Sequence, residues 1–190
     1  MKVTNVMIVG VGGQGILLAS RLLGKVMADE GLDVKVSEVH GMSQRGGSVV
    51  TYVRFGEKIY SPIITEGEAD CILSFEKLEA ARWAPFLKKG GRMIVNTQEI
   101  APMPVIAGKE AYPKNILSEL TEKGVDTDAL DALSLAVEAG SAKAVNVVLM
   151  ARFARTSSVP FERWIKAIEE IVSPAFRDVN VKAFEAGYNA

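Results

Sequence analysis

The stretch Val6-Met7-Ile8-Val9-Gly10-Val11-Gly12-Gly13-Gln14-Gly15 decides the fold that this 190-residue sequence predicts. Its first four residues form a continuous apolar run, which is typical of a strand buried on both faces of a parallel sheet. Glycines then break the run, and apolar residues recur at helical spacing over about residues 16–29. Gly31 stands where a glycine commonly ends a helix, and a second strand begins at Val34. The sequence therefore predicts a strand, a crossover helix and a second strand that runs parallel to the first.

The glycine loop after the first strand fits the pattern G-x-G-x-x-G. Between a strand and a helix, such glycines let backbone N–H groups approach a diphosphate at the positive end of the helix. The same glycines also permit a tight turn and close helix–strand packing without any ligand, so both interpretations stay open. The candidate phosphate or ligand loop consists of Gly10, Gly12, Gly13, Gln14 and Gly15.

An acidic residue, Glu38, lies near the end of the second predicted strand. A dinucleotide enzyme places the acid that binds a ribose hydroxyl at this position, which favours NAD or FAD binding. The following residues argue against it, because a polar loop and a β-rich segment replace the next helix and parallel strand of a plain dinucleotide domain. The loop, residues 38–47, carries several polar side chains and is typical of a functional loop.

The β-rich segment predicts an antiparallel excursion. Ser48–Phe55 contains many β-branched and aromatic residues, and Gly56-Glu57-Lys58 before Ile59-Tyr60 indicates a hairpin turn. A short buried strand at Cys71–Ser74 and a helix at Phe75–Trp83 then continue the sheet.

The second half alternates further elements. It predicts a strand at Met93–Asn96, an edge strand at Val105-Ile106 and a short helix over Ile116–Lys123, and it leaves residues 132–137 ambiguous between strand and helix. The last two predicted helices, 142–155 and 161–172, are respectively apolar all round and amphipathic. The fold class is α/β: a Rossmann-like, mostly parallel sheet with flanking helices and an antiparallel hairpin excursion. Without an evident linker, residues 1–190 are expected to form one domain.

Composition excludes several classes of partner. The 22 Lys+Arg and 23 Asp+Glu residues give a formal net charge of -1, so no basic field is available for nucleic acid or an anionic membrane. No apolar stretch reaches the roughly 18 residues that span a bilayer, and the start lacks the features of a signal peptide. A single cysteine, Cys71, cannot alone hold zinc or an iron–sulfur cluster. These features predict a cytoplasmic protein with no metal centre of its own.

Two long motifs, taken together, resemble a known family. Residues 11–17 (VGGQGIL) and 37–49 (SEVHGMSQRGGSV) are similar to the gamma-type domain of pyruvate and other 2-oxoacid:ferredoxin oxidoreductases. The size and the C-terminal pattern are most similar to the beta subunits of the indolepyruvate type. Shorter matches continue the resemblance at Ala69-Asp70, Leu73-Ser74-Phe75-Glu76, Glu138-Ala139-Gly140, Asn146-Val147-Val148-Leu149, Asp178-Val179-Asn180 and Lys182-Ala183-Phe184.

The resemblance implies an accessory subunit of an enzyme that oxidatively decarboxylates a 2-oxoacid, in the nearest case an arylpyruvate. The complete enzyme transfers the acyl group to coenzyme A as cosubstrate and passes electrons to ferredoxin. Thiamine diphosphate, Mg and the iron–sulfur clusters are expected in a larger partner subunit, and this chain alone is expected to bind no cofactor. Its contribution would be completion of the complex and part of the coenzyme A site or of the active-site entrance.

Several side chains are candidates for a role at an interface or a ligand. Arg45 offers a planar fork of donors and Gln44 a donor–acceptor pair, although both also suit a loop fastened to its own backbone. His40 has no evident acidic partner, which favours a structural hydrogen bond over acid–base catalysis. Cys71 is expected to be packed rather than reactive. The apolar residues 144–153 favour intramolecular core, with a dry interface as the alternative.

Three functions remain in competition on these grounds. The first is the accessory subunit, the second a stand-alone NAD- or FAD-dependent oxidoreductase, and the third a nucleotide-sensing module. A dehydrogenase binds its dinucleotide and turns over alone, a sensor binds without turnover, and an accessory subunit does neither without its partner.

Overall fold

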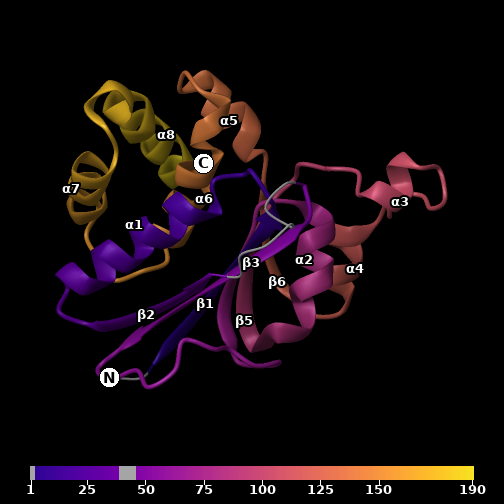
Figure 1. Cartoon of the computed structure of the whole chain (residues 1–190), viewed down its shortest axis with the longest axis horizontal. Coiled ribbons are helices and arrows are strands. Elements are labelled where there is room, and N and C mark those ends of the chain that lie inside the picture. Colours follow the sequence, from indigo (N-terminus) through magenta and orange to yellow (C-terminus); the bar gives the residue numbers. More distant parts are fainter. Residues whose placement is uncertain (1–2, 39–45) are drawn as a thin grey trace.

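A computed structural model describes residues 3–38 and 46–190 of the chain (Figure 1). Six strands form one sheet in the order β2-β3-β1-β4-β5-β6. The pairs on one side of β1 are parallel, whereas β3 is antiparallel to both of its neighbours. The strands are β1 (Thr4–Val11), β2 (Asp33–Glu38), β3 (Ser48–Gly56), β4 (Ala69–Ser74), β5 (Leu87–Asn96) and β6 (Asp126–Leu130). The predicted fold class, α/β with a mostly parallel sheet and an antiparallel excursion, is confirmed.

Helices cover both faces of the sheet, so the core has two layers (Figure 1). One face packs against α1 (Ile16–Asp29), α5 (Ala132–Glu138), α6 (Val145–Ala154), α7 (Phe161–Ile171) and α8 (Arg177–Asn189). The other face packs against α2 (Lys77–Trp83) and α4 (Ile116–Glu122). Short elements complete the chain: α3 (Met103–Ile106), which projects from the body in Figure 1, and the 3-10 turns η2 (Ala84–Phe86), η3 (Ala142–Ala144) and η4 (Pro174–Phe176).

The first strand and helix form as the sequence predicts. The apolar run of β1, residues 6–9, is fully buried, as expected for a strand covered on both faces. α1 buries a stripe that includes Leu22, Leu23 and Val26 against the sheet. Gly31, at a φ of 80°, ends this helix: its N–H donates to Ala28, and the next N–H reaches back to Met27.

The predicted hairpin turn at Gly56-Glu57-Lys58 is wrong. β3 ends at Gly56, and Ile59-Tyr60 is not a strand; the antiparallel hairpin is instead made by β2 and β3, so its connection is the segment that contains residues 39–45. Ile59 is buried, and its N–H donates to Asp33 Oδ2 at 2.9 Å. This backbone hydrogen bond, followed by Lys35, lowers the pKa of the Asp33 carboxyl. β2 does run parallel to β1, but β3 lies between them.

The predicted edge strand at Val105-Ile106 is also wrong. These residues end α3, a helical turn that begins after Pro102 and carries Pro104 in its first turn. A proline is tolerated there because the N–H that it lacks would have no hydrogen-bond partner within the helix. The edge strand on this side of the sheet is β6, and the ambiguous segment that follows it is helical. Asp131 caps the start of α5, because its carboxylate accepts the Ser134 N–H at 3.0 Å.

The C-terminal helices close one face of the sheet. Every residue of α6 except Arg152 is buried, which confirms that this helix is covered on several sides and identifies it as core of this chain. The amphipathic α7 buries Trp164 and Ile168, as predicted. α8 was not predicted; it lies so close to α6 that a Cβ on Gly187 would stand 2.3 Å from the Val148 carbonyl oxygen.

Candidate functional site

The glycine loop lies at the carboxyl end of β1, between the β3 and β4 sides of the sheet (Figure 1). Ligands of open α/β sheets bind at this edge, where the strand order reverses. Gly15 precedes α1 at a φ of 84°, a left-handed conformation that glycine adopts without a steric penalty. The first turn of α1 contains no acidic residue, so no side chain of that turn neutralises the positive end of the helix dipole.

Gly10 and Gly15 are required by packing. A Cβ at Gly10 would stand 2.7 Å from Gln14 Oε1 and 2.8 Å from Phe75 Cβ. A Cβ at Gly15 would stand 2.7 Å from Asn146 Nδ2, the same atom that donates to the Gly15 carbonyl oxygen at 3.1 Å. Asn146 is a buried α6 residue whose contact with the loop no spacing in the sequence indicated. The two glycines therefore support the interpretation in which they serve close packing.

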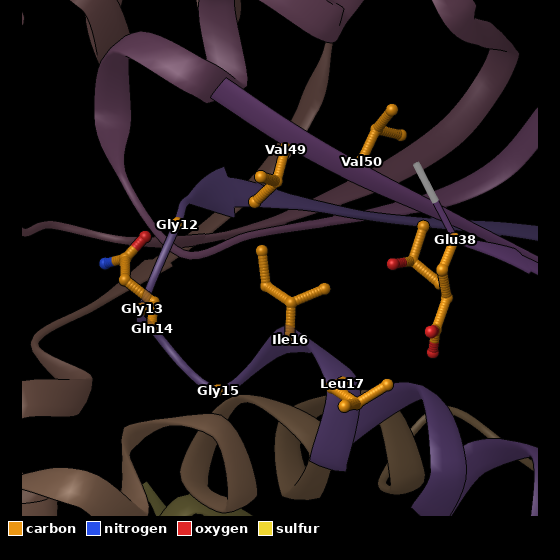
Figure 2. A pocket seen from close by; sticks show the side chains of 10 residues that line it. Gly12, Gly13, Gln14, Gly15, Ile16, Leu17, Glu38, Val49 and Val50 are labelled. Carbon is orange, nitrogen blue, oxygen red and sulfur yellow. The ribbon is translucent and has the colours of Figure 1, made fainter. Parts of the chain in front are cut away.

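Gln14 fastens the loop to the neighbouring strands. Its Oε1 accepts the Val11 N–H at 2.8 Å, and its Nε2 donates to the Phe75 carbonyl at 3.0 Å and to Gln98 Oε1 at 3.2 Å. Asn96 extends this network, because its Nδ2 also donates to the Phe75 carbonyl, at 3.1 Å. Figure 2 shows the Gln14 side chain directed away from Ile16 and Glu38. Gln14 thus ties the glycine loop to the chain just after the ends of β1 and β4.

A cavity of about 380 Å³ lies on the other side of the glycine loop. This glycine-loop cavity falls in the size range of small-molecule sites, roughly 300–1,000 Å³. Figure 2 shows its two walls, the glycine loop with the start of α1 and the start of β3, and Glu38 at the far end. The lining residues are Gly12, Gly13, Gln14, Gly15, Ile16, Leu17, Glu38, Val49, Val50 and Thr51.

The structure thus brings Glu38 to the same cavity as the glycine loop. Its Oε1 accepts a hydrogen bond from Ser20 Oγ on α1 at 3.2 Å. Among the lining residues that the structure describes, Glu38 is the one with a charge, and Ile16, Leu17, Val49 and Val50 make the walls largely apolar. A carboxylate beside apolar walls suits a ligand that presents a hydroxyl group and a flat apolar surface.

Three predicted site residues, His40, Gln44 and Arg45, lie outside the described residues. The residues that follow them are tied to the glycine loop: Gly12 donates to the Gly47 carbonyl at 2.9 Å, and Gly46 donates to the Gly12 carbonyl at 3.4 Å. The end of the loop therefore meets the cavity at Gly12.

Cys71 is buried in β4, as predicted, and its burial raises the pKa of the thiol to about 12. Within residues 3–38 and 46–190, no cluster of three or more His, Cys, Asp or Glu side chains could hold a metal ion. No helix in the described part of the chain is long and apolar enough to cross a membrane.

Comparison with known proteins gives matches along nearly the whole chain. The family model of pyruvate ferredoxin/flavodoxin oxidoreductase matches residues 5–190. The indolepyruvate oxidoreductase subunit IorB of Thermococcus kodakarensis is 47% identical, over 100% of this chain and 96% of that protein.

Two solved structures share the fold. The gamma subunit of keto/oxoacid ferredoxin oxidoreductase from Geobacter sulfurreducens has a TM-score of 0.72 and 22% identity, covering 98% of this chain and 96% of that one. The 2-oxoglutarate:ferredoxin oxidoreductase of Magnetococcus marinus, solved with 2-oxoglutarate, coenzyme A and succinyl-CoA bound, has a TM-score of 0.77 and 18% identity. There the match covers 100% of this chain and 31% of the longer chain.

Proposed function

Because the chain belongs to the pyruvate ferredoxin/flavodoxin oxidoreductase family, we propose that it is the accessory subunit of a 2-oxoacid:ferredoxin oxidoreductase of the indolepyruvate type. One observation carries the proposal: 47% identity to an indolepyruvate oxidoreductase subunit extends over 100% of this chain and 96% of that subunit. The similarity therefore includes the glycine loop, the sheet and the C-terminal helices together. We also propose that residues 1–190 act as one gamma-type domain.

The complete enzyme oxidatively decarboxylates an arylpyruvate, transfers the acyl group to coenzyme A and passes the electrons to ferredoxin. Thiamine diphosphate, Mg and the iron–sulfur clusters belong to a larger partner subunit. The sequence supports this division, because a four-iron cluster needs four thiolates and the chain has one cysteine. The near-neutral charge supports a complex without a nucleic-acid or membrane partner, and we place this complex in the cytoplasm.

Within the complex, the glycine-loop cavity receives the nucleotide end of coenzyme A. The uncapped start of α1 favours a phosphate, and the apolar walls suit an adenine ring. Glu38 is placed to accept a hydrogen bond from a ribose hydroxyl, the role that its position in the sequence predicts. Arg45 and Gln44 remain the candidates for contact with the partner subunit or an anionic group of the ligand.

The position of Gln14 favours this function over a stand-alone NAD or FAD enzyme. Its three hydrogen bonds tie together the chain at the ends of β1, β4 and β5. A pyrophosphate that approached the loop at Gln14 would compete with these bonds.

Co-purification from the native host tests the proposal. An affinity-tagged chain should retain a larger protein that contains thiamine diphosphate and iron, whereas the isolated chain should bind neither NAD nor FAD in calorimetry. Dinucleotide binding with turnover by the isolated chain would establish the dehydrogenase, and binding without turnover would establish the nucleotide sensor.

A further inference from the structure

Helix α2 carries a buried carboxylate, Glu79, that contacts the start of β3, the strand that forms one wall of the glycine-loop cavity. Glu76 caps the start of this helix, and its side chain accepts the Glu79 N–H at 2.9 Å. The spacing Glu76-x-x-Glu79 is that of a capping box, in which the second side chain turns back to the N–H of the first residue. Glu79 turns elsewhere, because both of its carboxylate oxygens are engaged by other side chains.

Glu79 Oε2 accepts hydrogen bonds from Ser48 Oγ and, at 3.3 Å, from Trp83 Nε1. Its Oε1 accepts the Arg82 Nε–H at 3.1 Å. Glu79 is only 4% exposed, and a buried carboxylate depends on such donors. Trp83 Nε1 also lies 3.4 Å from Ser48 Oγ, so two residues of α2 meet at this hydroxyl. The helix thus fixes a strand residue rather than its own first turn.

Ser48 is the residue at which β3 meets the glycine loop. It pairs with Val11, the last residue of β1, whose N–H is held by Gln14. The next three residues of β3, Val49 to Thr51, line the glycine-loop cavity. In the pair Val11–Ser48, Gln14 therefore holds the β1 residue and Glu79 holds the β3 residue.

The remainder of β3 does not need this contact. Its register with β1 continues through Phe55, and Val53 and Phe55 are buried in the core. Ser48 forms the terminal pair, and ladder ends open more easily than their centres. Loss of the Glu79 contact is therefore expected to loosen the start of β3 without unfolding the sheet.

We propose that Glu79 is a positioning residue for the glycine-loop cavity: through Ser48, its carboxylate holds the start of β3 opposite residues 12–17. The identity of the ligand rests on the proposed function, whereas the positioning rests on the geometry alone. Loss of the Glu79–Ser48 contact should therefore weaken ligand binding, whereas the rate of the reaction in the bound complex should stay that of the wild type.

Kinetics of the reconstituted complex test this role. Ser48→Ala should raise the KM for coenzyme A at least fivefold and leave kcat within twofold, and Glu79→Ala should act in the same direction. Ser48→Thr keeps the hydroxyl on a β-branched side chain and should restore the KM to within twofold of wild type. Ser134→Ala is the matched control, because it removes a serine–carboxylate contact, 2.6 Å to Asp131, at the start of α5, which does not line the cavity.

Hydrogen exchange on the isolated chain separates this proposal from the function that it builds on. In Ser48→Ala, amides 48–51 should exchange at least tenfold faster than in Ser134→Ala. If the wild-type complex turns over and Ser48→Ala has an unchanged KM, the proposal is wrong, whatever the exchange shows. If the wild-type complex shows no coenzyme A-dependent turnover, the proposed function fails. Equal exchange of amides 48–51 in Ser48→Ala and Ser134→Ala would overturn the positioning role, whatever the turnover.

Discussion

Gly15 and Gly13 are glycines for different reasons. Both have positive φ, 84° and 103°, but a Cβ on Gly13 would meet nothing within 4 Å, whereas one on Gly15 would meet Asn146. The backbone conformation makes Gly13→Ala cost about 1–2 kcal/mol. Gly15→Ala should cost about 1 kcal/mol more, because it also displaces the Asn146 hydrogen bond to the Gly15 carbonyl.

A double-mutant cycle checks this difference. In an Asn146→Ala background the obstacle is absent, so Gly15→Ala should cost about as much free energy of unfolding as Gly13→Ala does. Equal costs of the two glycine substitutions in the wild-type chain would contradict the packing role of Asn146.

Arg45 belongs to the loop that ends at the cavity. If the role of Arg45 lies in the complex, Arg45→Ala should change the free energy of unfolding of the isolated chain by less than about 0.5 kcal/mol. It should weaken association with the larger subunit, or coenzyme A-dependent ferredoxin reduction, by a larger amount. Association and kinetics measured on the same samples separate a docking defect from a ligand defect. If Arg45→Ala and Gln44→Ala are both without effect, neither side chain has the proposed role.

Cys71 should be inert in the folded chain. Burial raises the pKa of its thiol to about 12, so at pH 8 roughly one thiol in ten thousand is a thiolate, the form that reacts. Iodoacetamide should label it slowly at pH 8 and rapidly in denaturant. The unfolded thiol, with a pKa of about 8.5, ionises at a lower pH than the folded one. The contribution of the protonated thiol to folding stability is therefore fully present below about pH 8.5 and is lost as the pH rises toward 12. Rapid native labelling would show that Cys71 is accessible.

At the scale of elements, local patterns predicted the structure where one segment carried its own signal. β1 and α1 follow from an apolar run, a glycine break and a helical stripe. β6 was missed because its sequence, Asp126-Thr127-Asp128-Ala129-Leu130, has no apolar run, and the strand is defined by pairing with β5. The hairpin was misplaced because the turn residues after β3 do not determine its partner. β3 pairs with β2, and burial of the apolar side chains of the sheet sets this pairing.

The candidate site was predictable to a similar extent. The glycine loop and Glu38, both selected from motif spacing, line one cavity because both lie at strand ends on one edge of the sheet, and their binding role stays a prediction. Asn146, Glu79 and Ser48 were not identified as supports, because each acts through a contact between elements distant in sequence. No local periodicity reports such contacts.

The packing of α6 against α8 is tight enough to test. Gly187→Ala would place a Cβ 2.3 Å from the Val148 carbonyl, a backbone atom that cannot move without shifting α6. We expect a loss of at least about 3 kcal/mol in the free energy of unfolding. Glu185→Ala, on an exposed face of α8, should stay within about 0.5 kcal/mol and serves as the control. Equal stability of the two variants in urea unfolding would mean that the helices are not in this contact.

At the scale of the whole molecule, the chain has a sheet covered on both faces and a cavity beside the glycine loop, but its one cysteine cannot supply a redox cluster. Two buried layers give the chain its own hydrophobic core, and under the proposed function the partner subunit supplies the chemistry. We therefore expect the isolated chain to purify folded, colourless and without iron. Stoichiometric iron with visible absorption after anaerobic purification would contradict this.

Titration of the larger subunit with this chain tests the central claim most directly. Ferredoxin reduction is measured with indolepyruvate and coenzyme A while the chain is added to a fixed amount of the larger subunit. The rate should be near zero for either protein alone and should rise to saturation as the complex forms. A full rate from the larger subunit alone, or turnover by this chain alone with NAD or FAD, would contradict its assignment as an accessory subunit.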